Sequence, residues 1–208
     1  MSGHGRFITL EGVDGSGKST QAAMLAEALE ARGLRVVRTR EPGGTELGEG
    51  LRELLLRSGA GLSPVAEMHL FAAARAQLVA EVIGPALSEG MWVVADRFLD
   101  SSLAYQGAAR GLGVTEVLRT NAMAVEGHMP DCTLYLDVPP TTAAARRNGD
   151  SDRIEREGDT FQARVEAGYR DLVDRFPVRI RVVDGAGTPE EVHARVMRHV
   201  DPLIAAAG

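Results

Sequence analysis

The sequence predicts an α/β fold in which a parallel sheet of five strands is covered by helices on both faces. Short apolar, β-prone runs alternate along the chain with longer segments of helical periodicity. Strands joined by helices in this way form parallel sheets that are buried on both sides. The 208 residues contain no internal repeat and no interdomain linker, so we expect one domain over residues 1–208.

The start of the chain predicts two strands and the helix between them. Residues 7–10 form a short apolar run, and a glycine-rich turn follows it. Residues 19–32 place apolar side chains at helical spacing and stop at Gly33, which is a suitable C-terminal cap. The pair 36–37 predicts the second strand, which leads into a turn-rich segment at 41–44.

The alternation of helix and strand continues to the end of the chain. Residues 46–57 predict a short helix, and Ser63 followed by Pro64 predicts the capped start of a long helix that runs to about Ser88. A capping-box spacing at Thr188 opens the final helix. Three further buried strands are predicted at residues 92–95, 133–136 and 180–183.

Composition limits the class of protein. With 44% hydrophobic and 25% charged residues, the chain has the balance of a soluble globular protein. The net charge of −6 argues against non-specific binding of nucleic acid. The single cysteine, Cys132, excludes an internal disulfide framework, favours a cytoplasmic location and is expected in the core. We see no signal peptide and no apolar run long enough to span a membrane.

A complete P-loop follows the first predicted strand. Gly12, Gly17, Lys18 and Ser19 match the pattern G-x4-G-K-[ST] between a strand and a helix. Its glycines let backbone N–H groups converge on phosphate oxygens, and the helix N-terminus adds partial positive charge. We therefore expect ATP or another nucleoside triphosphate to bind here. The predicted binding residues are Gly12, Val13, Asp14, Gly15, Ser16, Gly17, Lys18, Ser19 and Thr20.

Lys18 is the only lysine in a chain that otherwise uses arginine. A compact ammonium fits inside the tight loop and reaches phosphate oxygens, whereas a guanidinium is longer and planar. The hydroxyl of Ser19 is a ligand for Mg²⁺, which bridges the nucleotide phosphates. Asp14 is unusual because a carboxylate opposes phosphate binding. It could bind a hydroxyl of a second ligand, lie near the metal or point into solvent.

Three further stretches carry a family resemblance. They are Arg40–Thr45 (REPGGT), Leu70–Arg75 (LFAAAR) and the segment from Asp96 to Gly107 (DRFLDSSLAYQG). Together with the P-loop, they resemble thymidylate kinase over nearly the whole chain. The resemblance implies the P-loop nucleoside monophosphate kinase fold and phosphorylation of dTMP to dTDP, a step in dTTP synthesis. It also implies ATP as phosphoryl donor, Mg²⁺ and a homodimer, for which the helix 64–88 is a candidate interface.

The resemblance assigns roles at the ends of the strands and on the long helix. Asp96, at the end of a buried strand, would hold Mg²⁺ with Ser19. Arg97 would bind the dTMP phosphate with its fork of donors. An Asp-Arg pair can also be a purely structural ion pair. Phe71 would stack on thymine and Arg75 would bind its O4, since residues four apart share a helix face. From the sequence alone, a phenylalanine at this position would more often be a core residue.

Four more residues complete the implied dTMP site. Ser102 would face the thymine ring, Tyr105 would pack near the deoxyribose, and Gln106 would lie near the sugar and phosphate. Asp14 would contact the 3′-hydroxyl, which gives its carboxylate a reason to be in the loop. The loop after the second strand offers no basic residue beyond Arg40, although some family members have one there.

Residues 146–158 are charged and nearly free of apolar side chains, and they match the lid of the family. One subgroup has an arginine in the P-loop, where this chain has Gly15. The other has catalytic arginines in the lid. The resemblance therefore places the chain in the second subgroup, with Arg153 as the first choice for a catalytic arginine and Lys18 and Arg97 as the other catalytic residues. The lid candidates are Arg146, Arg147, Arg153 and Arg156.

The remaining polar features suggest no further chemistry. The five histidines lack ligand spacing, so we propose no zinc site. Glu67 and Glu81 are predicted to be solvated positions on the long helix. The segment 185–187 passes beneath adenine in the family or is a simple turn. Two rival interpretations are a kinase for another nucleotide and a binding module that is switched by a nucleotide.

Overall fold

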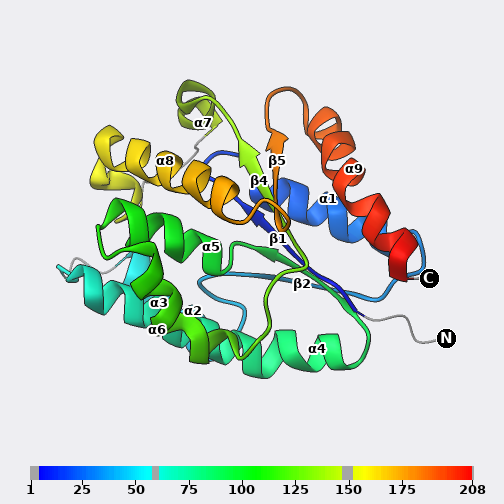
Figure 1. The fold of residues 1–208 in the computed structure, drawn as a ribbon, viewed down its shortest axis with the longest axis horizontal. Coiled ribbons are helices and arrows are strands. Elements are labelled where there is room, and N and C mark those ends of the chain that lie inside the picture. Colours follow the sequence, from blue (N-terminus) through cyan, green and yellow to red (C-terminus); the bar gives the residue numbers. More distant parts are fainter. Residues whose placement is uncertain (1–4, 58–60, 147–151, 208) are drawn as a thin grey trace.

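The computed structural model describes residues 5–57, 61–146 and 152–207, and within them it contains the expected sheet (Figure 1). The strands lie in the order β2-β3-β1-β4-β5, and every neighbouring pair is parallel. Each strand contains one of the five predicted runs. The strands are β1 (Phe7–Glu11), β2 (Val36–Arg40), β3 (Trp92–Asp96), β4 (Cys132–Asp137) and β5 (Ile180–Asp184).

Helices connect the strands and cover both faces. The described helices are α1 (Lys18–Glu30), α2 (Glu46–Leu56), α3 (Pro64–Leu78), α4 (Gly84–Ser88), α5 (Leu99–Ser102), α6 (Val114–Val125), α7 (Pro140–Arg146), α8 (Asp159–Arg175) and α9 (Pro189–Ala207), with π-helical segments η1 (Val79–Ile83) and η2 (Leu103–Ala109) and a 3₁₀ turn η3 (Glu155–Glu157). The helices α5, η2, α6, α7 and α8 were not individually predicted. The predicted lid residues 147–151, Arg147 among them, lie outside the described residues.

The strands alternate their side chains between two hydrophobic clusters. On one face, Ile8, Leu10 and Trp92 pack with Leu25 of α1 and Val196 of α9. On the other, strand residues such as Phe7 and Val93 pack with α3, η1, η2, α6 and α8. Figure 1 shows α1 and α9 together on one side of the sheet and α8 and α3 on the other. This two-sided burial explains why the central strands β1, β3 and β4 are mostly apolar, whereas the edge strands β2 and β5 also carry exposed side chains.

The predicted caps hold their helices as expected. The Ser63 hydroxyl accepts a hydrogen bond from the Ala66 N–H at 3.2 Å. Thr188 and Glu191 form the reciprocal bonds of a capping box at the start of α9. Gly33 has a φ of 81°, the left-handed conformation that favours glycine. Cys132 is buried, and burial raises the pKa of its thiol to about 11, so it is an inert core residue.

The long predicted helix is continuous from Pro64 to Ser88 and includes the π-helical segment η1. By length and composition this stretch could cross a membrane, with a mean hydropathy of 1.4 over an 18-residue window, which the sequence analysis did not anticipate. Core helices of soluble proteins pass the same test. Here the stretch packs against α2 and α6, and two of its charged side chains, Glu67 and Arg75, are buried in contacts within the protein.

A buried ion pair connects α5 to the residue that precedes β5. Both guanidinium Nη atoms of Arg179 donate to Asp100, at 2.5 and 2.7 Å, and the Thr133 hydroxyl donates to the same carboxylate at 2.9 Å. The Asp100 side chain is 1% exposed. Removing the arginine would leave a carboxylate without a countercharge in the interior.

We therefore expect Arg179→Met to lower the free energy of unfolding by about 3–5 kcal/mol, because breaking a buried pair leaves an uncompensated charge. Urea denaturation followed by circular dichroism measures this change. Arg119→Met is the matched control, since Arg119 and its partner Glu116 are largely exposed, and we expect its effect to be at most about 1 kcal/mol. Equal effects of the two variants would contradict the assignment.

Candidate active site

The P-loop connects β1 to α1 at the carboxyl edge of the sheet, where ligands bind in open α/β folds. Gly12 has a φ of 142°, and a Cβ built there would lie 2.8 Å from the carbonyl oxygen of Leu136 on β4. Gly17, immediately before α1, is left-handed with a φ of 96°. Glycine is therefore required at both positions, one for space and one for conformation.

Lys18 lies inside the loop rather than in solvent. Its Nζ donates to the carbonyl oxygen of Val13 at 2.8 Å and lies 4.0 Å from the carboxylate of Asp14. Burial, with a contribution from the nearby charge of Arg97, lowers the pKa of this ammonium to about 8. Phosphate oxygens bound in the loop would add negative charge beside the ammonium and favour its charged form.

A cleft of about 530 Å³ opens above the P-loop, and we call it the donor cleft. Basic side chains from four parts of the chain line it, in addition to Lys18: Arg40, Arg52, Arg97 and Arg146. Of the nine residues predicted to bind ATP, six line this cleft, namely Asp14, Gly15, Gly17, Lys18, Ser19 and Thr20. Gly12, Val13 and Ser16 shape the turn instead.

Ser19 and Asp96 meet at the floor of the donor cleft. The hydroxyl of Ser19 donates to the carboxylate of Asp96 at 2.5 Å. The pairing of Leu10 with Asp96 between β1 and β3 brings the carboxylate beside the P-loop. A hydroxyl and a carboxylate next to a phosphate site suit Mg²⁺, which takes few protein ligands and keeps several waters. The two predicted metal residues therefore fit the ion.

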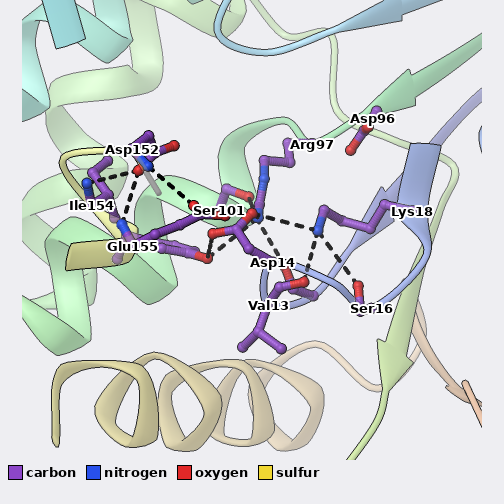
Figure 2. A network of polar contacts seen from close by, with 12 residues as sticks. Val13, Asp14, Ser16, Lys18, Asp96, Arg97, Ser101, Asp152, Ile154 and Glu155 are labelled. Carbon is purple, nitrogen blue, oxygen red and sulfur yellow. Dashed lines mark hydrogen bonds and ion pairs between the residues drawn. The ribbon is translucent and has the colours of Figure 1, made fainter. Parts of the chain in front are cut away.

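Arg97 is the centre of the polar network in Figure 2. Its backbone is left-handed, with a φ of 73°, and it directly follows β3. One terminal nitrogen donates to Asp14 at 2.5 Å and to the Tyr105 hydroxyl at 3.3 Å. Burial alone would raise the pKa of Asp14, but Arg97 and Lys18 outweigh it and bring that pKa to about 2. Asp14 is thus an ionised, paired residue, and it does not simply point into solvent.

A buried carboxylate, that of Glu11, is linked to Arg97 through two hydroxyl groups. Glu11 accepts from the hydroxyls of Ser101 at 2.6 Å and Tyr169 at 2.9 Å. Both hydroxyls also receive a bond from the other terminal nitrogen of Arg97. Burial and the charge of Asp100 raise the pKa of Glu11 to about 7. This layer could not be predicted from the sequence, because its members are far apart along the chain.

The raised pKa of Glu11 makes the free energy of unfolding depend on pH. Between the ordinary pKa of 4.5 and about 7 the folded protein holds a proton on Glu11 that the unfolded chain has lost. This contribution to stability is therefore full below pH 4.5 and is lost as pH rises through 7. We expect Glu11→Gln, which is neutral at every pH, to gain up to about 3 kcal/mol relative to the parent between pH 5 and pH 8. Urea midpoints at both pH values measure it, and a difference independent of pH would contradict it.

A second pocket, of about 90 Å³, lies beside the donor cleft, and we call it the acceptor pocket. All seven residues predicted to bind dTMP line it, namely Asp14, Phe71, Arg75, Arg97, Ser102, Tyr105 and Gln106. They come from the P-loop, α3, the turn after β3, α5 and η2. Glu41, Arg52, Asp152 and Ile154 also line the pocket and were missed. Arg52 donates to the carbonyl oxygen of Pro42, whose peptide bond with Glu41 is cis.

Arg75 is held by a buried network rather than left free in the pocket. Its terminal nitrogens donate to Asn121 at 2.5 Å, to Glu41 at 2.6 Å and to Ser102 at 3.0 Å. The side chain is 1% exposed. Asn121, on α6, was not predicted, because nothing in its local sequence distinguishes it from other helix positions. The guanidinium is therefore fixed in one orientation at the wall of the acceptor pocket.

The two lid arginines Arg146 and Arg153 differ in their position relative to the cavities. Arg146 lines the donor cleft and donates to the carbonyl oxygens of Gly185 and Gly187. Arg153 lines neither cavity, because its guanidinium donates to Glu67 at 2.6 Å. Glu67 is 1% exposed, so the prediction that it is solvated was wrong. Glu81 is exposed, as expected.

Comparisons with known proteins identify the family of the chain. The family model described as thymidylate kinase matches residues 10–196. The chain belongs to the thymidylate kinase family. It is 49% identical over 205 residues to the thymidylate kinase of Rhizorhabdus wittichii, covering 96% of this chain and 99% of that one. It is 50% identical over 202 residues to the enzyme of a Synechococcus species, covering 97% and 98%.

A solved structure shows the same fold. The thymidylate kinase of Ehrlichia chaffeensis aligns with a TM-score of 0.78 at 34% sequence identity, covering 95% of this chain and 98% of that one. The P-loop kinase fold predicted from the sequence is thereby confirmed. Membership of the thymidylate kinase family makes the chain a nucleoside monophosphate kinase, which phosphorylates dTMP with ATP as the donor.

Proposed function

We propose that the acceptor pocket holds dTMP and the donor cleft holds ATP, so that the two substrates meet at Asp14 and Arg97. The observation that carries this proposal is that the two cavities share these side chains, together with Glu41 and Arg52. An acceptor phosphate bound by Arg97 then lies next to the P-loop, where the γ-phosphate of ATP would be. Phosphoryl transfer requires such an in-line placement of the attacking oxygen.

The chemistry assigned to these residues is positioning and charge stabilisation. The acceptor phosphate oxygen is already anionic, so no general base is needed. Lys18 and the N–H groups of the P-loop neutralise the charge that spreads over the transferred group. Mg²⁺ held by Ser19 and Asp96 would supply further positive charge to the β- and γ-phosphates. Arg97 orients the attacking phosphate through two parallel donors.

Within the acceptor pocket, the base and the sugar are read by different side chains. Phe71 offers a half-buried aromatic face for thymine, and the fixed guanidinium of Arg75, with Ser102, offers donors for a base carbonyl. Asp14 and Tyr105 are paired through the Tyr105 hydroxyl at 3.4 Å, and we assign them to the deoxyribose. Gln106 completes this wall.

We further infer that a lid arginine acts on the transferred group, as in the subgroup that lacks an arginine in the P-loop. Arg146 already lines the donor cleft. The catalytic role that we predicted for Arg153 would require its ion pair with Glu67 to break. The segment 185–187, whose carbonyl oxygens Arg146 and Arg195 bind, borders a small cavity of about 150 Å³ that we assign to adenine.

The proposal extends to the assembly and its location. We propose a cytoplasmic homodimer formed by chains of one domain each, with the outer face of α3 and α6 as the interface. Val65 of α3 is 50% exposed and Met123 of α6 is 91% exposed, which supports an apolar contact there. Sedimentation velocity measures the assembly, and Met123→Arg should shift a dimer toward the monomer.

A substrate panel tests the proposed sites. ADP formation from ATP and Mg²⁺ is measured with dTMP, dUMP, UMP, dCMP, dGMP or no acceptor. We expect strong turnover with dTMP and little with the others. We also expect Arg75→Lys, which keeps a countercharge for the buried Glu41, to lower kcat/KM for dTMP about 10²-fold or more, because the base loses the guanidinium donor. Equal slow hydrolysis of ATP in every reaction would overturn the assignment of the acceptor pocket.

A further inference from the structure

Glu67 is a buried carboxylate that the proposed reaction does not use. It lies in the first turn of α3, four residues before Phe71, and accepts four hydrogen bonds from three side chains. Burial opposes its ionisation, but the bonds from Arg110, Gln106 and Arg153 outweigh that effect, and the pKa of Glu67 lies below its ordinary value. At neutral pH the carboxylate is therefore ionised and acts only as an acceptor.

One carboxylate oxygen determines how Gln106 is presented. The Nε2 of Gln106 donates to the Oε1 of Glu67 at 2.9 Å. Because an ionised carboxylate cannot donate, the amide nitrogen must face Glu67, and the amide oxygen is left for other partners. Gln106 is 1% exposed and lines the acceptor pocket. Glu67 thus fixes the orientation of the Gln106 amide in the wall of the acceptor pocket.

The other carboxylate oxygen holds residues 152–157, which we call the lid stretch. The Oε2 of Glu67 accepts from Arg153 at 2.6 Å and from Arg110 at 3.0 Å. Arg110 in turn pairs with Glu157 at 2.6 Å, so both ends of the lid stretch are tied to this one carboxylate. Between the two ties, Ile154 is 6% exposed and lines the acceptor pocket together with Asp152.

Backbone contacts set the lid stretch against the end of α2. The Arg153 N–H donates to the carbonyl oxygen of Leu56 at 3.0 Å, and the Arg153 Nε donates to that of Leu55 at 2.8 Å. The ion pair with Glu67 therefore completes a docking site built from α2 and α3. Arg153 and Arg110 are 15% and 14% exposed, so solvent screens these pairs little.

We propose that Glu67 is a positioning residue of the acceptor pocket, which with one side chain orients Gln106 in the pocket wall and docks the lid stretch over the pocket. The proposal rests on the assignment of this pocket to dTMP. In this arrangement Arg153 is an anchor of the lid stretch. Binding of the acceptor should then depend on Glu67, whereas binding of ATP, in the donor cleft, should not.

The main test is Glu67→Gln, which keeps the shape of the side chain and removes its charge. We expect KM for dTMP to rise at least tenfold while KM for ATP changes less than twofold. Glu53→Gln is the matched control, because Glu53 lies on the neighbouring α2 in an exposed pair with Arg57. A Glu67→Gln variant with a lower melting temperature but an unchanged KM for dTMP would overturn the proposal, since that result indicates a merely structural role.

A second measurement needs no substrate. Trypsin cleaves after arginine, and mass spectrometry can follow cleavage after Arg153 and Arg156 in the protein without nucleotide. If Glu67 docks the lid stretch, Glu67→Gln should speed cleavage there at least fivefold, and Glu53→Gln should not. Unchanged cleavage would overturn the docking role. Because this assay does not depend on turnover, it separates failure of the present proposal from failure of the dTMP assignment, which would appear as no turnover in the parent enzyme.

The variant Arg153→Met covers the case in which Glu67→Gln does not fold. If Arg153 anchors the lid stretch, Arg153→Met should raise KM for dTMP. If the role of Arg153 is purely catalytic, the same substitution should lower kcat and leave that KM unchanged. In the double variant the two substitutions should raise KM no more than the larger single effect, because each removes the same contact. Multiplicative effects on KM, or a change in kcat alone, would overturn the coupling.

Discussion

Replacing Lys18 by arginine should lower kcat/KM for ATP by about 10²–10³-fold, even though the charge is retained. The Nζ of Lys18 is enclosed in the P-loop, 2.8 Å from the carbonyl oxygen of Val13, and the residue is 6% exposed. A guanidinium is larger, planar and longer, so it cannot occupy this space without displacing the loop. Steady-state kinetics with varied ATP and saturating dTMP measures the loss.

The control is the same exchange in the opposite direction at a distant site. Arg198 is exposed on α9, and Arg198→Lys introduces a second lysine into a chain that has one. We expect this variant to keep the parent kcat/KM within about twofold, because surface substitutions have small effects. If Lys18→Arg were as active as Arg198→Lys, the ammonium would not be the group that the loop requires.

The second large effect is expected at Arg97. Its two terminal nitrogens are divided among five acceptors, among them Asp14, Ser101 and Tyr169. This fork is matched to a phosphate, and a lysine at the same position would offer a single nitrogen. We expect Arg97→Lys to lower kcat/KM for dTMP by at least about 10²-fold, because both the acceptor and the network around Asp14 lose their geometry.

Varying dTMP at saturating ATP measures this effect, and ATP affinity should change little by comparison. Arg119→Lys is the control, because Arg119 is largely exposed in a pair with Glu116. A loss confined to ATP binding would show instead that Arg97 serves the donor, and an unchanged kcat/KM for dTMP would remove it from the acceptor site.

The sheet and the P-loop could be predicted because their signals are local. The central strands β1, β3 and β4 are short apolar runs that are almost entirely buried, and the P-loop residues follow one another at a fixed spacing. The connecting helices α6 and α8 were not individually predicted, since their faces are less uniform than the strands. The pocket residues Phe71 and Arg75 were predicted only because a motif places them, and not from periodicity.

The residues that were missed act through contacts distant in sequence. Glu67 looked like an ordinary solvated helix position, yet its partners are 39 to 86 residues away. Arg52 reaches both cavities only because α2 packs beside α3. Arg153 was expected near the phosphates, and its spacing in the lid gave no indication of the direction in which the side chain points. Local sequence is enough to predict a strand, but which side chain a residue contacts depends on how the elements pack.

The network around Arg75 has a consequence for how base preference can change over evolutionary time. The guanidinium that we assign to the base is also the countercharge of the buried Glu41 and a partner of Asn121. A substitution that altered the preferred base would at once leave a carboxylate without its partner in the interior. New specificity at this site would therefore need several concerted changes, and most single mutants would lose folded protein before they gained another substrate.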